Sequence, residues 1–420
     1  MRVELAYGRQ GTSVEVPDTA EVVAPVDQPR LDDEAAAITG ALRRPLAGPP
    51  LAELLGRAGR VAVVFPDLTR PMPNRTVLPP LLDELARAGV PDEHVTLLCA
   101  TGTHRQATAE EMEELVGPGI VARYAIVDHD ATGDAHVRVG EVDGAAVLLQ
   151  REYVEADVRI ITGFVEPHFF AGFSGGPKAV CPGLAATDTV LEAHHPRRIA
   201  DARATFVTRS GNPVHDFVRA ATALAPPHLS LDVAINRERR VAAVFAGPLP
   251  EAHDAACAHV RASAVREVAA PFDLVVTTNG GYPLDRNLYQ AVKGMAAAER
   301  IVRDAGIVVM AAACEDGVPA GGAFARLLEA AGSPADLAGA TGQPELDRWQ
   351  AQVLGRVLAR AEVHLHAGGL DERAIASALL APAPDLDRAV AVALERLGPG
   401  ARVAVIPEGP LTVATVRPEF

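Results

Sequence analysis

Short apolar runs alternate with amphipathic stretches along most of the chain, a pattern that predicts β-strands alternating with α-helices. In the first half, runs over 61–66 (VAVVFP) and 94–100 (HVTLLCA) predict strands, and each is followed by a predicted helix, over 76–89 and 109–117. Strands that alternate with helices form a mostly parallel sheet covered on both faces. The pattern therefore predicts an α/β fold.

A second series of the same kind begins after the Ala-rich stretch 254–270, which we expect to be helical. The other predicted elements are a hairpin over 2–16, strands over 122–128, 156–165, 272–279, 306–313, 362–368 and 401–407, and helices over 32–43, 288–304, 323–331, 346–361, 371–380 and 385–397. We expect two α/β domains, 1–268 and 269–420, each with a mostly parallel sheet. The active site is expected in the cleft between them.

The composition restricts the class of protein. The net charge is −15, which argues against nucleic acid as a partner because phosphate binding needs a basic face. No apolar run reaches the roughly 18 residues that span a bilayer, and the N-terminus lacks the apolar core of a signal peptide. The four cysteines form no CxxC pair and are interpreted as buried thiols. We therefore expect a soluble cytoplasmic protein without a membrane or nucleic-acid partner.

Lysine is almost absent from this chain. Of the 39 basic residues only Lys178 and Lys293 are lysines, and all the others are arginines. A codon bias explains the arginines but not the two lysines that remain. A primary amine can act as a nucleophile or carry an acyl group, which a guanidinium does not easily do. Both lysines are therefore candidates for a chemical role.

Polar residues gather just after the predicted strands. The segments are FPDLTRP, ATGTHR, GFVEPHFFAGFSGGPKAVCPG and NGGYPLDRNLYQAVKG, and the last two contain the two lysines. In open α/β sheets ligands bind outside the carboxyl ends of the strands. One shared site is therefore expected.

The stretch GFSGGPK (172–178) has two interpretations. Its glycines would let backbone N–H groups approach a phosphate, and Pro177 suits the first turn of a helix. It is no Walker loop, since Pro177 and Ala179 flank the lysine, and no GxGxxG motif occurs. The alternative is a plain glycine-rich turn, but the lysine within it favours a functional role.

Four histidines stand out among the 13 in the chain. His104 in TGTHR and His168 in VEPHFF each follow a predicted strand, and two imidazoles from different strands could exchange protons on opposite faces of one carbon. A lone histidine is more often structural, but Arg70, Arg105 and Lys178 in similar positions favour a site. The adjacent His194 and His195 are weak evidence for a metal, because neighbours on a helix point about 100° apart.

Taken together, these motifs resemble the nickel-pincer-nucleotide-dependent lactate racemases. The matching pieces are DLTRP (67–71), TGTHR (101–105), EPHFFAGFSGGPKAVCPG (166–183), TVLEAH (189–194), GNPVH (211–215), GGYPLDRNLYQAVKG (280–294) and DRWQAQ (347–352). They run in order from about residue 60 to 360, and their joint occurrence is specific.

The resemblance implies a cofactor and its ligands. The cofactor is a pyridine mononucleotide with two sulfur-bearing groups and a carbon bonded to nickel, attached to Lys178 through a thioamide. His194 rather than His195 would fill the fourth nickel position, which suits nickel in a planar sulfur and imidazole site. The stretch of Ser174, Gly175 and Gly176 would receive the phosphate, and Trp349 would lie near the pyridine ring, although core packing is its plainer interpretation.

The resemblance also implies a reaction: racemisation or epimerisation of a 2-hydroxy acid, by hydride transfer from its Cα through a 2-keto acid. His104 and His168 would be the acid/base pair, while Arg70 and Lys293 would hold the substrate carboxylate. Further substrate contacts are implied for Asp67, which would orient a histidine or Arg70, and for Tyr289 and Gln290. The partners would be a small 2-hydroxy acid and the proteins that make the cofactor.

Two alternatives stay open from the residues alone. Lys178 beside a glycine-rich loop could hold pyridoxal phosphate as a Schiff base. A non-enzymatic two-domain protein that binds a small carboxylate would need Arg70 and Lys293 but neither the two histidines nor Lys178.

Overall fold

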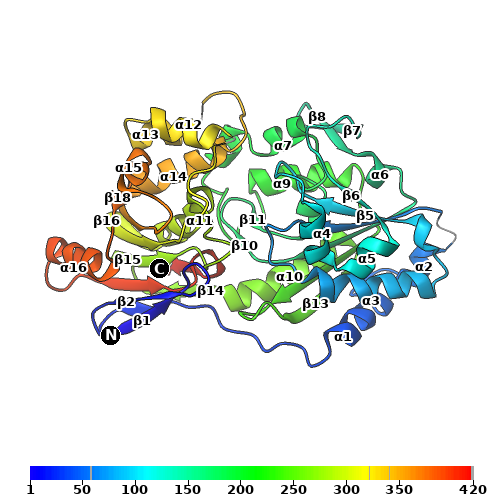
Figure 1. The fold of residues 1–420 in the computed structure, drawn as a ribbon, viewed down its shortest axis with the longest axis horizontal. Helices are drawn as coiled ribbons and strands as arrows, with labels where there is room; N and C mark the ends of the chain where they lie inside the picture. The colour runs from blue at the N-terminus through cyan, green and yellow to red at the C-terminus, as the bar shows by residue number, and fades with distance from the viewer. Residues whose placement is uncertain (57–58, 321, 340, 418–420) are drawn as a thin grey trace.

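The computed structural model describes residues 1–56, 59–320, 322–339 and 341–417. Two α/β halves lie side by side, each built on a six-stranded sheet (Figure 1). No helix within these ranges is both long and apolar enough to cross a membrane.

The sheet of the first half has the order β13-β12-β9-β4-β5-β6, and all its neighbours are parallel except β12 and β13. Its strands are β4 (Val61–Pro66), β5 (Val95–Ala100), β6 (Ala125–Asp128), β9 (Val158–Phe164), β12 (Leu229–Ile235) and β13 (Val241–Gly247). The helices of this half are α1 (Glu34–Arg43), α2 (Leu51–Leu55), α3 (Asn74–Arg87), α4 (Ala109–Val116), α5 (Pro118–Arg123), α6 (Arg151–Val154), α7 (Thr187–Ala193), α8 (Pro196–Ile199), α9 (Pro213–Ala223) and α10 (Leu249–Ala264), with 3-10 turns η1 (Asp92–His94) and η2 (Gly176–Ala179). Two small hairpins join β7 (His136–Val142) to β8 (Ala145–Gln150) and β10 (Pro167–His168) to β11 (Gly172–Phe173).

The sheet of the second half has the order β18-β17-β16-β15-β19-β3 and is parallel throughout. Its strands are β3 (Glu21–Val22), β15 (Phe272–Thr278), β16 (Val302–Ala311), β17 (Ala361–His366), β18 (Ala381–Pro382) and β19 (Val403–Ile406), and two-stranded pairs join β1 (Arg2–Leu5) to β2 (Thr12–Glu15) and β14 (Val265–Val268) to β20 (Val413–Val416). Its helices are α11 (Leu288–Glu299), α12 (Ala323–Ala330), α13 (Pro334–Ala338), α14 (Arg348–Arg360), α15 (Glu372–Ser377) and α16 (Leu386–Leu397), with the 3-10 turn η3 (Gly409–Leu411).

The central strand β4 shows why its sequence is apolar throughout. Val61 and Val63 pack into a core with α1 and α3, whereas Ala62 and Val64 face the opposite core, which includes α7 and α9. Successive side chains of a strand point to opposite faces, so a strand covered on both sides needs apolar residues at every position. The α/β class predicted from this pattern is confirmed.

The N-terminal segment lies with the second half, although the expected first domain began at residue 1. The predicted hairpin is present as β1 and β2, and β3 adds to the edge of the second sheet beside β19. Val14 and Val16 share a core with Leu274 and Val276 of β15. The hairpin therefore covers one face of the second sheet, and the chain then crosses to α1 in the first half (Figure 1). The boundary near residue 268 stays a prediction.

Candidate active site

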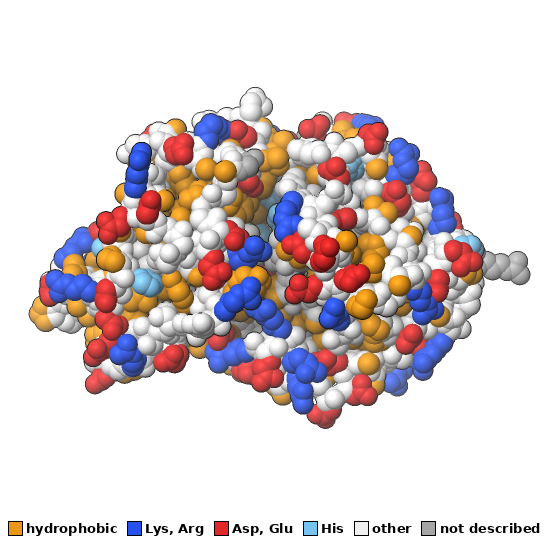
Figure 2. Space-filling model, viewed as in Figure 1, with side chains coloured by type: hydrophobic (Ala, Val, Ile, Leu, Met, Phe, Trp, Pro, Cys, Tyr) orange, Lys and Arg blue, Asp and Glu red, His pale blue; other side chains and the backbone are white. Residues whose placement is uncertain are grey.

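A cavity of about 140 Å³ lies at the carboxyl ends of β4, β5 and β9 in the first half of the molecule. Helices α11 and α14 of the second half form its opposite wall. Figure 2 shows the surface hollowed between the two halves. Of the residues predicted for the site, all but Gly176 line this cavity; these are Asp67, Arg70, His104, His168, Ser174, Gly175, Lys178, His194, Tyr289, Gln290, Lys293 and Trp349. The polar segments after the strands therefore converge as expected.

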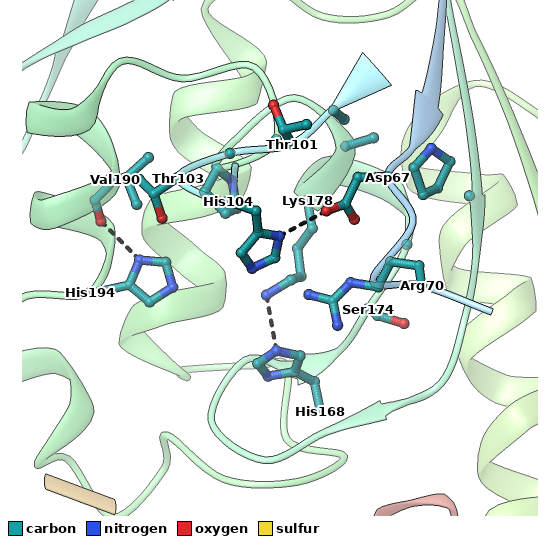
Figure 3. A pocket seen from close by; sticks show the side chains of 18 of the residues that line it. Asp67, Arg70, Thr101, Thr103, His104, His168, Ser174, Lys178, Val190 and His194 are labelled. Atoms are coloured by element: carbon teal, nitrogen blue, oxygen red, sulfur yellow. Dashed lines mark hydrogen bonds and ion pairs between the residues drawn. The ribbon is translucent and has the colours of Figure 1, made fainter. Parts of the chain in front are cut away.

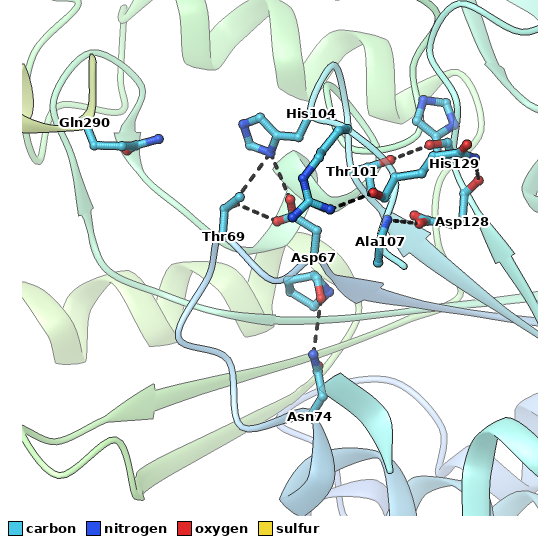
Figure 4. Close-up of polar contacts among 12 residues, drawn as sticks. Asp67, Thr69, Asn74, Thr101, His104, Ala107, Asp128, His129 and Gln290 are labelled. Atoms are coloured by element: carbon cyan, nitrogen blue, oxygen red, sulfur yellow. Dashed lines mark hydrogen bonds and ion pairs between the residues drawn. The ribbon is translucent and has the colours of Figure 1, made fainter. Parts of the chain in front are cut away.

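His104 is held by a buried carboxylate. Its Nδ1 lies 2.9 Å from Asp67 Oδ2, and the Thr69 hydroxyl donates to Asp67 Oδ1 at 2.8 Å (Figure 4). Burial opposes ionisation of Asp67, but the charge and hydrogen bond of His104 outweigh it and keep the pKa of Asp67 below its ordinary value. An ionised carboxylate only accepts, so Nδ1 carries a proton, and in the neutral ring Nε2 is the nitrogen with the lone pair. His104 is thus arranged as a base.

His168 is bonded differently. Its Nδ1 accepts the backbone N–H of Ala171 at 3.2 Å, and its Nε2 lies 3.3 Å from Lys178 Nζ (Figure 3). A neutral ring that accepts at Nδ1 carries its proton on Nε2, so Lys178 must accept that proton with a free amine lone pair. Burial, followed by Arg70 and Lys293, lowers the pKa of Lys178 to about 7, which agrees with a neutral amine.

Three basic side chains line the same space: Arg70, Lys178 and Lys293. Lys293 donates to Gln290 Oε1 at 2.5 Å, and burial together with Arg70 lowers its pKa. Glu166, like Asp67, is an acidic residue close to this group: burial raises the pKa of Glu166, while Arg70, Lys293 and Lys178 oppose the rise. An anionic ligand would be stabilised by the positive charges of Arg70 and Lys293.

His194, at the end of α7, is suited to bind a metal. Its Nδ1 lies 2.8 Å from the Val190 carbonyl, which can only accept, so the proton is on Nδ1 and Nε2 is free (Figure 3). Burial, with Lys178, lowers the pKa of His194 to about 4, so the ring is neutral. His195 instead caps α8 by accepting the Arg197 N–H. The geometry therefore separates the two neighbours.

A metal would need ligands from elsewhere. Among the residues that the structure describes, no group of three or more His, Cys, Asp or Glu side chains could hold a metal ion. The four cysteines are buried free thiols, as expected. A metal at His194 must therefore take its other ligands from a bound molecule.

The glycine-rich stretch does not form the predicted phosphate cradle. Ser174 N–H donates to the Glu166 carbonyl, Gly176 N–H donates to Asp232 Oδ1 at 3.0 Å, and Lys178 N–H donates to the Gly175 carbonyl. The Ser174 hydroxyl is also used, because it donates to the Phe164 carbonyl. A Cβ on Gly175 would come within 2.8 Å of Asp232 Oδ1. These glycines allow close packing against a buried carboxylate, which would repel a phosphate.

On the second half, Tyr289 and Trp349 form one wall of the cavity. The Trp349 indole donates to the Tyr289 hydroxyl at 2.8 Å. Its ring also lies against the His194 imidazole, with centroids 4.5 Å apart and planes inclined by 34°. Trp349 is buried, yet it contacts the cavity rather than only the core.

Three acidic residues near the cavity were not predicted from the sequence to belong to the site. Glu166 stands two positions before His168, and Asp347 stands two positions before Trp349, so an acidic residue beside each candidate was the available signal. Asp232 carried no such signal, because it lies on strand β12, 56 residues from Gly176.

Comparison with known proteins identifies the family. The model of the lactate racemase N-terminal domain matches residues 7–206, and that of the lactate racemase C-terminal domain matches residues 267–414. The chain is 32% identical over 420 residues to the lactate racemase of Thermoanaerobacterium thermosaccharolyticum, with 97% of each chain covered, and 34% identical over 383 residues to that of Lactiplantibacillus plantarum, with 90% of each covered.

One solved structure agrees with this assignment, and a second shares only the fold. The lactate racemase apoprotein from T. thermosaccharolyticum superposes with a TM-score of 0.92 at 31% identity, with all of both chains covered. A protein from Thermotoga maritima shares the fold, with a TM-score of 0.68 at 18% identity over 93% of this chain and all of that one. The chain therefore belongs to the lactate racemase family and is an isomerase.

Proposed function

We propose that this protein racemises or epimerises a small 2-hydroxy acid such as lactate, by reversible hydride transfer from the substrate Cα through a 2-keto acid. The supporting observation is that one cavity holds two imidazoles with different hydrogen-bond roles, His104 and His168, beside the cations Arg70 and Lys293. Two proton-handling groups and a carboxylate site are what this reaction requires of the protein.

The residues present fit a nickel-pincer nucleotide in part. The Lys178 amine would carry the cofactor, and the free Nε2 of His194 would bind the nickel. The other nickel ligands would come from the cofactor, because the described residues offer no cluster that could bind the metal alone. The stretch 174–176 does not fit its phosphate. When bound, the cofactor would supply the hydride acceptor. The proteins that make it would be partners of this chain.

The chain's own residues handle the proton and the carboxylate. His104 Nε2 would remove the hydroxyl proton of one enantiomer while Asp67 stabilises the resulting imidazolium. His168 Nε2–H would donate a hydrogen bond to the substrate oxygen. For His168 to act as a base at Nε2, its proton must instead be on Nδ1, and Nδ1 then no longer accepts the Ala171 N–H. Arg70 and Lys293 would hold the carboxylate.

Racemisation with loaded protein tests the proposal directly. Protein from a host that makes the cofactor should interconvert D- and L-lactate or another 2-hydroxy acid, and should contain nickel and an adduct absent from protein made in other hosts. An adduct without nickel would favour the pyridoxal phosphate alternative. Binding of a carboxylate with no turnover of any 2-hydroxy acid by the loaded protein would favour the binding-protein alternative.

Replacing Arg70 by lysine should lower kcat/KM about 30- to 1000-fold, because lysine cannot form the bidentate contact with a carboxylate. The loss should be similar for all 2-hydroxy acids, since they share the carboxylate. Arg105→Lys is the matched control, because Arg105 is paired with Glu111 outside the cavity. Steady-state kinetics with several 2-hydroxy acids measure this loss. A loss confined to one substrate would mean that Arg70 does not bind the substrate carboxylate.

The variant His194→Ala should lose nickel without losing the Lys178 adduct, since imidazole would supply one ligand and the cofactor the others. His195→Ala should keep both, because His195 caps α8. Metal analysis and intact mass of the two loaded variants give the answer. Nickel lost only from the His195 variant would reverse the assignment.

A further inference from the structure

Asn212 stands at the start of helix α9 and is completely buried, with an exposed fraction of 0%. Its Oδ1 caps the helix by accepting the backbone N–H groups of Val214 at 3.0 Å and His215 at 3.2 Å. A cap needs only this oxygen, and serine or aspartate would supply it equally well. The cap therefore does not explain why the side chain also carries an amide nitrogen.

That nitrogen binds the hairpin that carries His168. Asn212 Nδ2 donates to the carbonyls of Phe170 and Thr208, each at 2.9 Å. Both partners of Nδ2 only accept and both partners of Oδ1 only donate, so the orientation of the amide group is settled. Phe170 lies in the turn between β10 and β11, whereas Thr208 precedes α9. Asn212 therefore fastens the turn of the hairpin to the segment before α9.

The bond to Phe170 reaches His168 through a single peptide group. The carbonyl of Phe170 and the N–H of Ala171 belong to one planar unit, in which they point in opposite directions. Asn212 holds the carbonyl end, and the N–H end donates to His168 Nδ1 at 3.2 Å. Hydrogen bonds linked in this way also polarise one another. The Asn212 amide thus fixes the direction of the N–H group that faces the imidazole.

This N–H group determines which nitrogen of His168 carries the proton. Burial is the main cause that lowers the pKa of His168 well below its ordinary value, so the ring is neutral. A neutral imidazole has one N–H, and because Nδ1 accepts from Ala171, the proton is on Nε2. If the peptide group turned away, Nδ1 would lose its donor and this preference would weaken.

We propose that Asn212 is a positioning residue that, through the peptide group between Phe170 and Ala171, holds His168 in the tautomer with its proton on Nε2. Its importance for catalysis rests on the proposed function, in which His168 handles the substrate proton. The tautomer itself does not, because every contact in this chain exists in the protein alone.

Nitrogen NMR of apoprotein labelled with 15N-histidine can test the tautomer, because protonated and unprotonated ring nitrogens resonate far apart. The signals of His168 are assigned by their loss in His168→Gln. In the wild type we expect an unprotonated Nδ1 and a protonated Nε2. Asn212→Ser keeps a helix cap but removes the donor to Phe170, so both signals should move toward the average of two exchanging tautomers.

Tyr153→Phe is the matched control, because the Tyr153 hydroxyl donates to the Ala225 carbonyl at 3.0 Å, just beyond the other end of α9. It removes a buried bond to a carbonyl without touching the hairpin, and should leave the His168 signals unchanged. Circular dichroism verifies folding, and Asn212→Gly, also tolerated at an N-cap, replaces the serine variant if that variant does not fold. Wild-type His168 signals in the folded Asn212 variant, or equal shifts in the control, would overturn the proposal.

In the loaded enzyme, Asn212→Ser should lower kcat about 10- to 100-fold with little change in KM, as expected when a reacting group is displaced. In a His168→Gln background the same substitution should cause no further loss, because Asn212 acts through His168. Losses that multiply in the double variant would remove the catalytic part of the proposal. Absence of racemisation in the wild type, by contrast, would refute the proposed function and leave the NMR result standing.

Discussion

Replacing Lys178 by arginine is expected to abolish covalent cofactor loading and, with it, all racemisation. A guanidinium is also a basic side chain, but it cannot form the thioamide that a primary amine forms. The Lys178 amine is prepared for such chemistry, because burial and the neighbouring cations Arg70 and Lys293 lower its pKa to about 7. Intact mass of protein from a cofactor-producing host should show the adduct in the wild type and not in Lys178→Arg.

The low lysine content makes this experiment unusually clear. Lys293→Arg is the matched control and should keep the adduct, since the attachment site is elsewhere in the cavity. The rate at which an amine-reactive reagent modifies Lys178 should rise with pH through about 7 and level off above it, because the free amine is the reactive form. An adduct on Lys178→Arg, or one lost only from Lys293→Arg, would refute the assignment.

The sheets could be predicted from the sequence because their strands are buried on both faces. A run such as VAVVFP has no other common explanation when helices flank it, and β4 covers the predicted residues, Val61–Pro66. The N-terminal hairpin was predicted, but not its place, since the chain pattern does not say which sheet a hairpin covers. The antiparallel pair of β12 and β13 was missed altogether.

The candidate site was predictable for a related reason. Polar residues that follow parallel strands meet at one edge of the sheet. Their convergence could therefore be predicted without knowing how the rest of the chain folds. The role of Gly176 was not predictable in this way. A glycine-rich sequence permits close approach but does not say of what, and here the partner is Asp232 from a strand distant in sequence.

The orientation of each histidine also required the structure. No pattern in the sequence indicates that a carbonyl accepts a hydrogen bond from Nδ1 of His194, or that a backbone N–H faces Nδ1 of His168. These contacts decide which nitrogen can bind a metal or a proton. The identity of a residue was therefore predictable where its protonation state was not.

Replacing either His104 or His168 is expected to reduce racemisation by about 10²- to 10⁴-fold, the range that a general acid or base contributes. Glutamine is the informative substitution, because its amide can keep the contacts with Asp67 or Lys178 but cannot exchange a proton at neutral pH. Alanine variants then measure what the lost contacts add.

Each direction of a two-base racemisation uses both histidines, so neither variant should interconvert the enantiomers at the wild-type rate. A single turnover with Cα-deuterated substrate can still show hydride removal from the enantiomer that the remaining histidine serves. We expect His104→Gln and His168→Gln to retain that partial reaction with opposite enantiomers. Wild-type racemisation in either glutamine variant would make that histidine structural, and a partial reaction with the same enantiomer in both would mean that the two rings act on one face.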